Sequence, residues 1–413
     1  MPDERYQTVK DVVGGNFVHL FGGIRDPLDP ISSFTMDTLK PRYARVNMTL
    51  EDWEPANDNT DPASINWDGF KEVGFIPATM GFLRIAQERG GALTASAWDV
   101  PDWMVVDPEF DRSRELDPEL YPEVVETIAA WLLRARDDYG VAVDYVSFNE
   151  ATLGVNIQLT PDQYVALIAQ AGPRFEELGL TTKWLLGDCH DIGSCADYVQ
   201  AIYSHEAIRP YLGPLAFHSW DAGTQDADLI AIADFAEAND LEVWCTEGGW
   251  YAQLWRVPQQ YPTWTNALSL ATIYSRVLKL SRATVLEYWQ MMGADYQIND
   301  GESGFPVFHT LNQYADQFPE GTQIVGTSPD RNGIYILAGQ APAHFVVQVI
   351  NKNMVALPAA ISGLPDGMYT HIRSNADAVD SIIWTYDVTD GTLALDLPRG
   401  SISILTTRPV ISP

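Results

Sequence analysis

The chain has 413 residues, of which 46% are hydrophobic, and 56 Asp and Glu against 25 Lys and Arg give a formal net charge of −31 at pH 7. This composition supports a sizeable core and excludes global disorder, and the length favours one large domain plus a small one. So strong a negative charge repels phosphate backbones and anionic membrane surfaces, and no apolar run is long enough to cross a bilayer. We therefore expect neither nucleic acid nor a membrane as a partner. The ligand is expected to be neutral or cationic.

The amino-terminal residues MPDERYQTVKDVV lack the basic and apolar pattern of a signal peptide. We expect either a cytoplasmic protein or a mature secreted domain whose signal has been removed. Cys189 and Cys195 are close enough in sequence for a disulfide, and we leave their pairing open. Cys245 lies in a strand-like run and is predicted to be a buried thiol. Three thiols without a CxxC pair make a structural zinc site improbable.

Strand-like and helical patterns alternate through the first three quarters of the chain. A helix is predicted from Thr160, which starts a capping box with Gln163, to Gly179, and another is predicted to end at Gly140. Eight strand–helix units predict a (β/α)8 barrel, which we assign to residues 1–319. A doubly wound sheet would need a glycine-rich phosphate turn after its first strand, and HLFGGIRD matches that only faintly. The eight apolar runs are 16–23, 43–48, 91–98, 143–150, 183–188, 213–220, 241–249 and 283–290.

The pattern changes after about residue 320. Short alternating runs such as GIYILAG, HFVVQVIN and SIIWTYDV are separated by Gly, Pro, Asn and Asp, and no helical period appears among them. This predicts an antiparallel β-sandwich over residues 320–413, packed directly on the barrel because no long linker separates the two. Little chain precedes the first predicted barrel strand, so we expect it to contribute little to the sandwich.

Functional groups of such a barrel lie where the strands reach their carboxyl ends. The fourth run, VDYVSFNE, ends in Asn149 and Glu150, and the seventh, LEVWCTEGGW, ends in Glu247. Two glutamates at one rim suit cleavage of a glycosidic bond, in which one protonates the leaving oxygen and the other attacks the anomeric carbon. Their surroundings must hold them in different protonation states, and a nearby arginine would keep one of them ionised. Further strand-end candidates for substrate binding are Arg45, Trp98, His218, Trp220, Trp250 and Trp289.

Several motifs together resemble clan A of the glycoside hydrolases, and within it family 30, which includes glucosylceramidases, xylanases and β-1,6-glucanases or galactanases. ARVNMTLEDWEP is similar to the second-strand segment of that family and LTASAWDVPDWM to its third. The Asn-Glu pair at 149–150 and the glutamate of CTEGGW follow in the expected order. The resemblance covers nearly the whole barrel and agrees with an appended sandwich.

The resemblance implies a role for each matched residue. Glu247 is the nucleophile, Glu150 the acid/base, and Asn149 the ligand of the substrate 2-hydroxyl. Arg45 steadies the nucleophile, and Trp289 closes the −1 subsite. Trp98 and Trp103 are cleft residues, and Trp220 lies near the position of a tyrosine that hydrogen-bonds the nucleophile in the clan. The implied activity is that of a retaining β-glycoside hydrolase, which needs no cofactor.

Two other functions stay open at this point. The first is a carbohydrate-binding protein on the same scaffold, although binding a sugar needs no nucleophile. The second is a metal-dependent hydrolase, because Asp188, His190 and Asp191 in GDCHDIG could join His218 as ligands. Barrel metallohydrolases usually carry HxH after the first strand, and the first run here has only His19. We therefore predict no catalytic metal, while a structural Ca²⁺ ion stays open in so acidic a chain.

Overall fold

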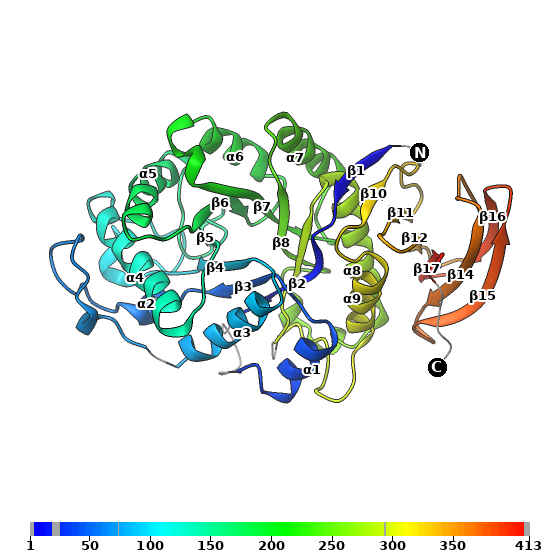
Figure 1. The fold of residues 1–413 in the computed structure, drawn as a ribbon, viewed down its shortest axis with the longest axis horizontal. Helices are drawn as coiled ribbons and strands as arrows, with labels where there is room; N and C mark the ends of the chain where they lie inside the picture. The colour runs from blue at the N-terminus through cyan, green and yellow to red at the C-terminus, as the bar shows by residue number, and fades with distance from the viewer. Residues whose placement is uncertain (1–3, 19–24, 73, 293–294, 409–413) are drawn as a thin grey trace.

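The computed structural model describes residues 4–18, 25–72, 74–292 and 295–408. Eight parallel strands close into a barrel, which confirms the predicted (β/α)8 architecture (Figure 1). The strands are β2 (Asp11–Phe17), β3 (Ala44–Asn47), β4 (Leu93–Ala97), β5 (Tyr145–Phe148), β6 (Lys183–Cys189), β7 (Leu212–Trp220), β8 (Val243–Gly249) and β9 (Val285–Tyr288). All eight have almost wholly buried residues, as expected for strands covered on both faces.

The first barrel strand begins earlier than predicted. The run at 16–23 suggested a strand there, but β2 spans Asp11–Phe17, and residues 19–23 of the run, His19 included, lie outside the described residues. The sequence DVVGGNF contains two glycines, which lower strand propensity and obscured the pattern. Gly15 is required by packing, because a Cβ there would lie 2.1 Å from the Met291 side chain.

Helices surround the barrel, and their ends follow the sequence signals. Thr160 and Gln163 form the capping box of α5, and α4 ends at Gly140, whose φ of 67° is left-handed. The helices are α1 (Pro30–Thr38), α2 (Leu50–Trp53), α3 (Ile76–Glu88), α4 (Tyr121–Tyr139), α5 (Pro161–Glu177), α6 (Cys195–Tyr203), α7 (Asp226–Ala238), α8 (Trp264–Arg276) and α9 (Pro306–Gln317). No helix in the described part of the chain is long and apolar enough to cross a membrane.

The carboxyl-terminal strands form the predicted β-sandwich. A seven-stranded sheet with the order β1-β10-β11-β12-β17-β14-β15 faces the pair β13-β16, and a separate apolar core fills the space between them. The strands are β10 (Gln323–Val325), β11 (Ile334–Gln340), β12 (Phe345–Asn351), β13 (Leu357–Ser362), β14 (Gly367–Ser374), β15 (Ser381–Val388), β16 (Thr392–Leu397) and β17 (Ser401–Thr406).

The amino terminus contributes to the sandwich, contrary to our expectation. Strand β1 (Arg5–Thr8) pairs antiparallel with β10 and so extends the large sheet, directly before the chain enters the barrel. A four-residue strand with half-exposed side chains carries too little hydrophobic pattern to be seen in the sequence. The domain boundary at 319/320 stays a prediction. Strand β1 lies in the first predicted domain by sequence but pairs with the sandwich sheet.

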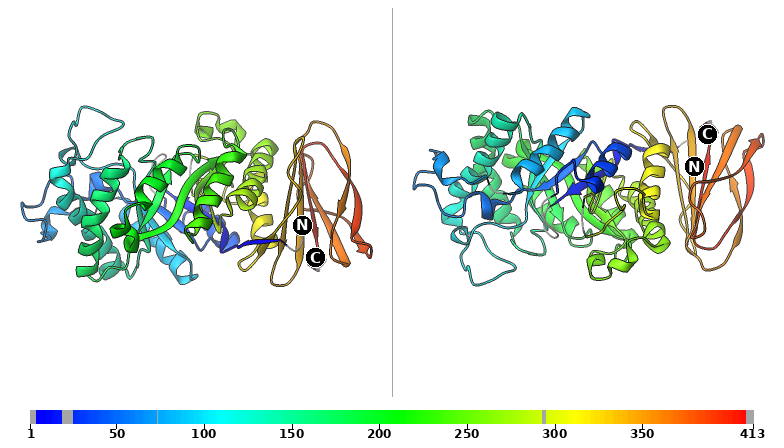
Figure 2. Two further views of the ribbon diagram at one scale, coloured as in Figure 1. Left: turned by 90° about the horizontal axis from the view of Figure 1, so that it is seen from above. Right: turned by 90° about the horizontal axis from the view of Figure 1, so that it is seen from below.

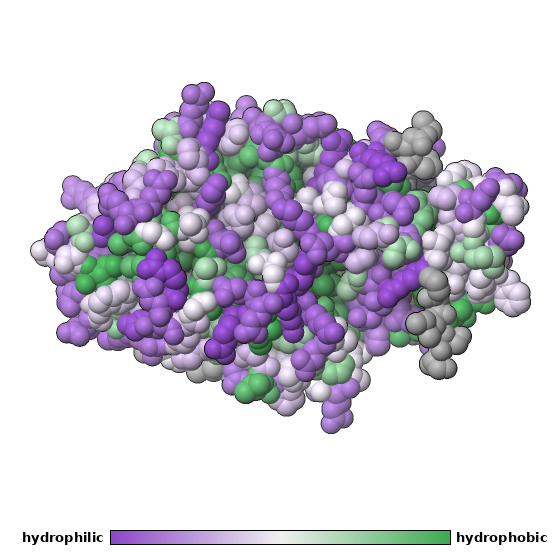
Figure 3. Space-filling view, in the orientation of Figure 1, coloured by the Kyte–Doolittle hydropathy of each residue, from purple (hydrophilic) through white to green (hydrophobic). Residues whose placement is uncertain are grey.

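The sandwich packs on the barrel through α8 and α9, which lie between the two in all three ribbon views (Figures 1 and 2). The Tyr314 hydroxyl on α9 donates a 2.7 Å hydrogen bond to the Gln348 side chain on β12. The Trp264 indole on α8 donates a 2.6 Å hydrogen bond to the carbonyl of Gly400. The surface in the same orientation is largely hydrophilic, in keeping with the acidic composition (Figure 3).

Candidate active site

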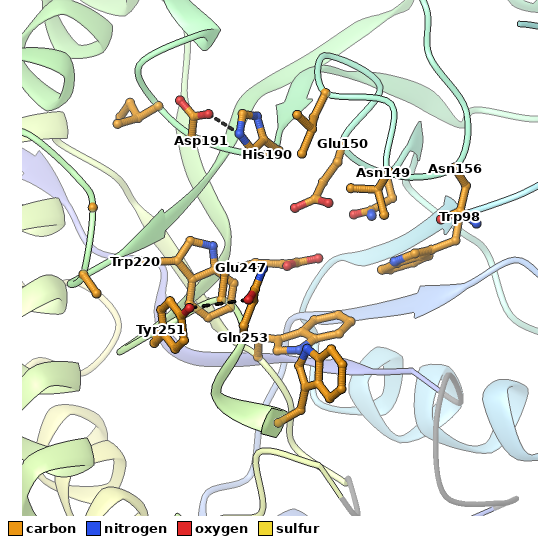
Figure 4. Close-up of a pocket in the computed structure, with 18 of the residues that line it drawn as sticks. Trp98, Asn149, Glu150, Asn156, His190, Asp191, Trp220, Glu247, Tyr251 and Gln253 are labelled. Carbon is orange, nitrogen blue, oxygen red and sulfur yellow. Dashed lines mark hydrogen bonds and ion pairs between the residues drawn. The ribbon is translucent and has the colours of Figure 1, made fainter. Parts of the chain in front are cut away.

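The two glutamates predicted at the strand ends lie next to each other. Glu150 lies two residues after the end of β5, and Glu247 lies within β8. One carboxylate oxygen of each, and a ring nitrogen of His218, lie within 4.8 Å of one another. Figure 4 shows the two carboxyl groups facing each other across the pocket. Glu150 has a left-handed φ of 52°, and its backbone N–H donates to the carbonyl oxygen of Asp188. The residue therefore holds a conformation that a non-glycine residue adopts only where its surroundings fix it.

Arg45, at the centre of β3, lies fully buried beneath this pair. Its guanidinium donates to Glu247 at 2.8 Å, Asn149 at 2.7 Å, Asp188 at 2.8 Å, Asn16 at 2.8 Å and Ser96 at 3.0 Å. Burial disfavours its charge, but the carboxylates of Asp188 and Glu247 outweigh that effect and raise the pKa of Arg45. Arg45 thus holds the Glu247 carboxylate and the Asn149 amide in fixed orientations.

Asp188 belongs to the same network, although the sequence analysis considered it only as a metal ligand. It ends the fifth predicted run and is fully buried, and it accepts hydrogen bonds from Ser147 at 2.6 Å and Thr246 at 2.7 Å besides that from Arg45. Burial alone would raise the pKa of Asp188, but Arg45 and His218 hold it well below its ordinary value. The rule that polar residues at barrel strand ends are functional would have identified it.

His218 connects the two glutamates. Its Nδ1 lies 3.0 Å from Glu150 Oε1 and 3.3 Å from Glu247 Oε2, and its Nε2 lies 3.4 Å from Asp188 Oδ1. Burial lowers the pKa of His218, but the three surrounding carboxylates outweigh this and raise it to about 10. The imidazole therefore carries a proton on each nitrogen at neutral pH and presents Nδ1–H to both glutamates.

The charge state of Glu247 depends on its neighbour. Burial raises the pKa of Glu247 to about 7, while His218 and Arg45 oppose this and the negative charge of Glu150 adds to it. Arg45 donates a hydrogen bond to Glu247 and so favours the ionised form of this carboxyl group.

The carboxylates open into a cavity of 850 Å³. Trp98, Trp220 and Trp289 line it as predicted, and the Trp98 and Trp289 rings lie 6.0 Å apart. Trp250 packs beside this aromatic group but is not among the described residues that line the cavity. Trp103 is not a lining residue either, and its indole N–H donates a 3.1 Å hydrogen bond to the carbonyl of Glu54.

Other lining residues come from loops and were not predicted as site residues. Tyr296 follows β9 and packs edge-on against Trp289, and its hydroxyl donates to the carbonyl of Ala252. Burial raises the pKa of Tyr296, and the charge of Glu247 adds to the rise. The other lining residues missed from sequence include Glu51, Asp99, Arg112, Asn156, Tyr251 and Gln253. Loops carry no periodic pattern from which such positions could be read.

The GDCHDIG segment contributes to the cavity wall without forming the metal cluster considered from sequence. His190 and Asp191 line the cavity, and the imidazole Nε2 of His190 contacts the Asp191 carboxylate (Figure 4). A disulfide joins Cys189 and Cys195 and closes this segment, and Cys245 is a free buried thiol as predicted.

The group in the described residues that has metal-ligand spacing at the site is Glu150, His218 and Glu247. It fits a divalent cation poorly, because the imidazole would have to release a proton held by three carboxylates. Glu247 moreover already accepts a hydrogen bond from the Arg45 cation. The cationic groups that contact the two glutamates here are Arg45 and His218.

No family model and no curated protein matches the sequence. Among solved structures, a family 30 glycoside hydrolase endoxylanase from Clostridium papyrosolvens C71 superposes with a TM-score of 0.75 at 15% identity, covering 99% of this chain and 98% of that one. The xylanase Xyn30A of glycoside hydrolase family 30 subfamily 8 from Clostridium acetobutylicum gives 0.75 at 14% identity, covering 98% and 97%. SrfJ from Salmonella typhimurium gives 0.72 at 19% identity, covering 99% and 92%. The chain therefore has the barrel-and-sandwich fold of these proteins.

Proposed function

We propose that the chain is a retaining β-glycoside hydrolase, with Glu247 as nucleophile and Glu150 as acid/base. The observation that carries this proposal is the spacing of the two carboxylates. One oxygen of each lies within 4.8 Å of the other, whereas an inverting enzyme keeps its carboxyl groups roughly 6.5–9.5 Å apart so that a water molecule fits between the base and the sugar.

The asymmetry of the surroundings supports the division of roles. Arg45 donates to Glu247 and to none of the Glu150 atoms, so it stabilises the ionised form of Glu247. Glu247 attacks the anomeric carbon, the glycosidic C–O bond breaks, and Glu150 gives its proton to the leaving oxygen. Glu150, now a base, takes a proton from the water that attacks the glycosyl ester and so frees Glu247. Asn149, oriented by Arg45, binds the 2-hydroxyl, and Trp289 supports the sugar ring.

The substrate class that fits best is a β-linked oligo- or polysaccharide. The cavity of 850 Å³ is lined by aromatic rings suited to sugar faces and by carboxylates and amides suited to hydroxyl groups. Two of the structural neighbours are xylanases by name, and a third similar structure is an endo-β-1,6-glucanase, so both kinds of polymer belong in a first panel.

A non-catalytic carbohydrate-binding protein is the second candidate, favoured only by the aromatic lining. It does not account for a buried arginine that holds one of two adjacent carboxylates.

Turnover of aryl β-glycosides (xyloside, glucoside, galactoside and fucoside) and of xylan and β-1,6-glucan tests the proposal. Wild type should hydrolyse at least one of them. Glu150→Ala should retain activity mainly on aryl glycosides, whose leaving groups need little protonation, while Glu247→Ala should lose at least about 10³-fold. Glycan binding by wild type without any turnover would favour the binding protein.

A further inference from the structure

A second group of carboxylates lies outside the candidate active site, where the segment that follows α2 meets the first turns of α4 (Figure 1). Asp58 belongs to that segment, and Glu123 and Glu126 lie on one face of α4. One oxygen of each residue lies within 4.8 Å of the others. In the described part of the chain, none of the three forms an ion pair with Lys, Arg or His.

Glu126 has no polar partner in this group that could support its charge. Its side chain is 1% exposed, and neither carboxylate oxygen receives a hydrogen bond from any described residue. Glu123 is 7% exposed, and its Oε2 also lacks a donor among these residues. Buried carboxylates are normally satisfied by donors or a cation, so this group requires an explanation.

Asp58 is fixed with its carboxylate toward the two glutamates. Its Oδ2 accepts a 2.7 Å hydrogen bond from the backbone N–H of Asn66, and its Oδ1 accepts a 2.9 Å hydrogen bond from the Asn59 side chain. The backbone at Gly69 passes so close that a Cβ there would lie 2.2 Å from Asp58 Cβ. Each Asp58 oxygen keeps a further lone pair, so the residue can still act as a ligand.

We propose that Asp58, Glu123 and Glu126 bind one Ca²⁺ ion that fastens the segment 54–70 to α4. The donors are carboxylate oxygens only, which suit a hard cation and not zinc or copper. Ligand oxygens around one Ca²⁺ ion lie no more than about 5 Å from each other at its usual bond lengths, and the three oxygens here all lie within 4.8 Å of one another. Mg²⁺ is smaller and usually keeps several water molecules, so a cage of three protein carboxylates suits Ca²⁺ better.

The site would stabilise one wall of the candidate active site from behind. Glu54 begins the same segment; its side chain accepts hydrogen bonds from Thr127 on α4 and from the backbone N–H of Asp58. Its carbonyl oxygen accepts the Trp103 indole N–H, and Glu51 one turn earlier lines the cavity. The ion is structural in this proposal, so the proposal does not depend on the reaction catalysed.

Calorimetric titration of chelator-treated protein with CaCl2 tests the site directly, with melting temperature as a second readout. We expect one ion per chain with a Kd between roughly 10⁻⁶ and 10⁻⁴ M, and a rise in Tm of about 3–5 °C at saturation. Glu126→Gln, which keeps the side-chain volume, should weaken binding at least about tenfold. Glu119→Gln removes the same charge from an exposed position just before α4 and should leave the Kd unchanged.

Absence of binding up to about 10 mM CaCl2 would overturn the proposal, since extracellular calcium modules bind within that range. Equal affinity of wild type and Glu126→Gln would also overturn it, because the ion would then lie elsewhere. Tighter binding of MgCl2 than of CaCl2 would contradict the choice of ion. If Glu126→Gln does not fold, Asp58→Asn provides the same test, because it removes the ligand that the segment 54–70 supplies and should weaken Ca²⁺ binding in the same way.

Discussion

The guanidinium of Arg45 donates a 2.8 Å hydrogen bond to Glu247, which lies 202 residues further along the chain. The two residues meet because β3 and β8 belong to one closed barrel whose strands deliver their side chains to a common end. Arg45 is fully buried, and its five hydrogen bonds go to side chains on four other barrel strands and to Asn149, which follows β5 directly. The position and the charge of the proposed nucleophile are therefore set by the barrel and not by a loop.

Asp188→Asn should destabilise the fold as well as reduce activity. The substitution leaves the buried charges of Arg45 and His218 without their shared counter-ion, and removal of one partner from a buried ionic network costs about 3–5 kcal/mol. Urea unfolding should show this loss. Asp197→Asn, an exposed position in α6, should change the free energy of unfolding by less than about 0.5 kcal/mol. Equal stability of the two variants would show that Asp188 is not the counter-ion.

His218→Gln should move the pH dependence of kcat/KM. The imidazolium lowers the pKa of Glu247, so its removal should raise that pKa. Because Glu247 acts in its ionised form, the acid limb should shift to higher pH by about one unit or more. His205→Gln changes an exposed histidine and should leave the limb in place. An unchanged or lowered limb in His218→Gln would contradict a charged His218.

Trp289→Ala should reduce kcat/KM by about 10- to 100-fold, because the sugar would lose an aromatic face. Trp289→Phe should recover part of the loss, since a smaller ring still offers a face. Trp67, an exposed tryptophan that is not a lining residue, provides the matched control, and Trp67→Ala should leave both kinetic constants unchanged. Full activity of Trp289→Ala would exclude a platform role.

The sequence predicted the parts of this molecule that follow strict periodic rules. Alternating apolar runs gave the barrel, and Thr160 with Gln163 marked the start of α5. Glu150 and Glu247 were predicted as a pair because barrel strands end at one rim, and the structure brings their carboxylates within 4.8 Å of each other. Strand β1 was missed because four half-exposed residues show no pattern, and its place depends on pairing with residues more than 300 positions away.

The site was predicted less completely than the fold. Tyr296 follows β9 on a loop and lies in no motif with characteristic spacing, whereas Asp188 lies near the end of β6, where the strand-end rule would have identified it. The roles of His218 and Glu247 depend on protonation states, which are set by burial and by neighbours from separate strands. The cluster of Asp58 with Glu123 and Glu126 was not predicted for the same reason. Asp58 precedes the two glutamates by at least 65 positions, and only the packing of its segment on α4 brings the three together.

Covalent trapping tests the proposed double displacement most directly. A 2-deoxy-2-fluoro-β-glycosyl fluoride of the sugar that wild type accepts should accumulate as a glycosyl-enzyme, because the fluorine slows its hydrolysis. Intact-mass measurement should show one sugar added per chain, and peptide mapping should locate it on Glu247. Glu247→Gln should take up no label. Absence of an adduct on wild type during turnover, or an adduct on Glu150 instead, would contradict the mechanism.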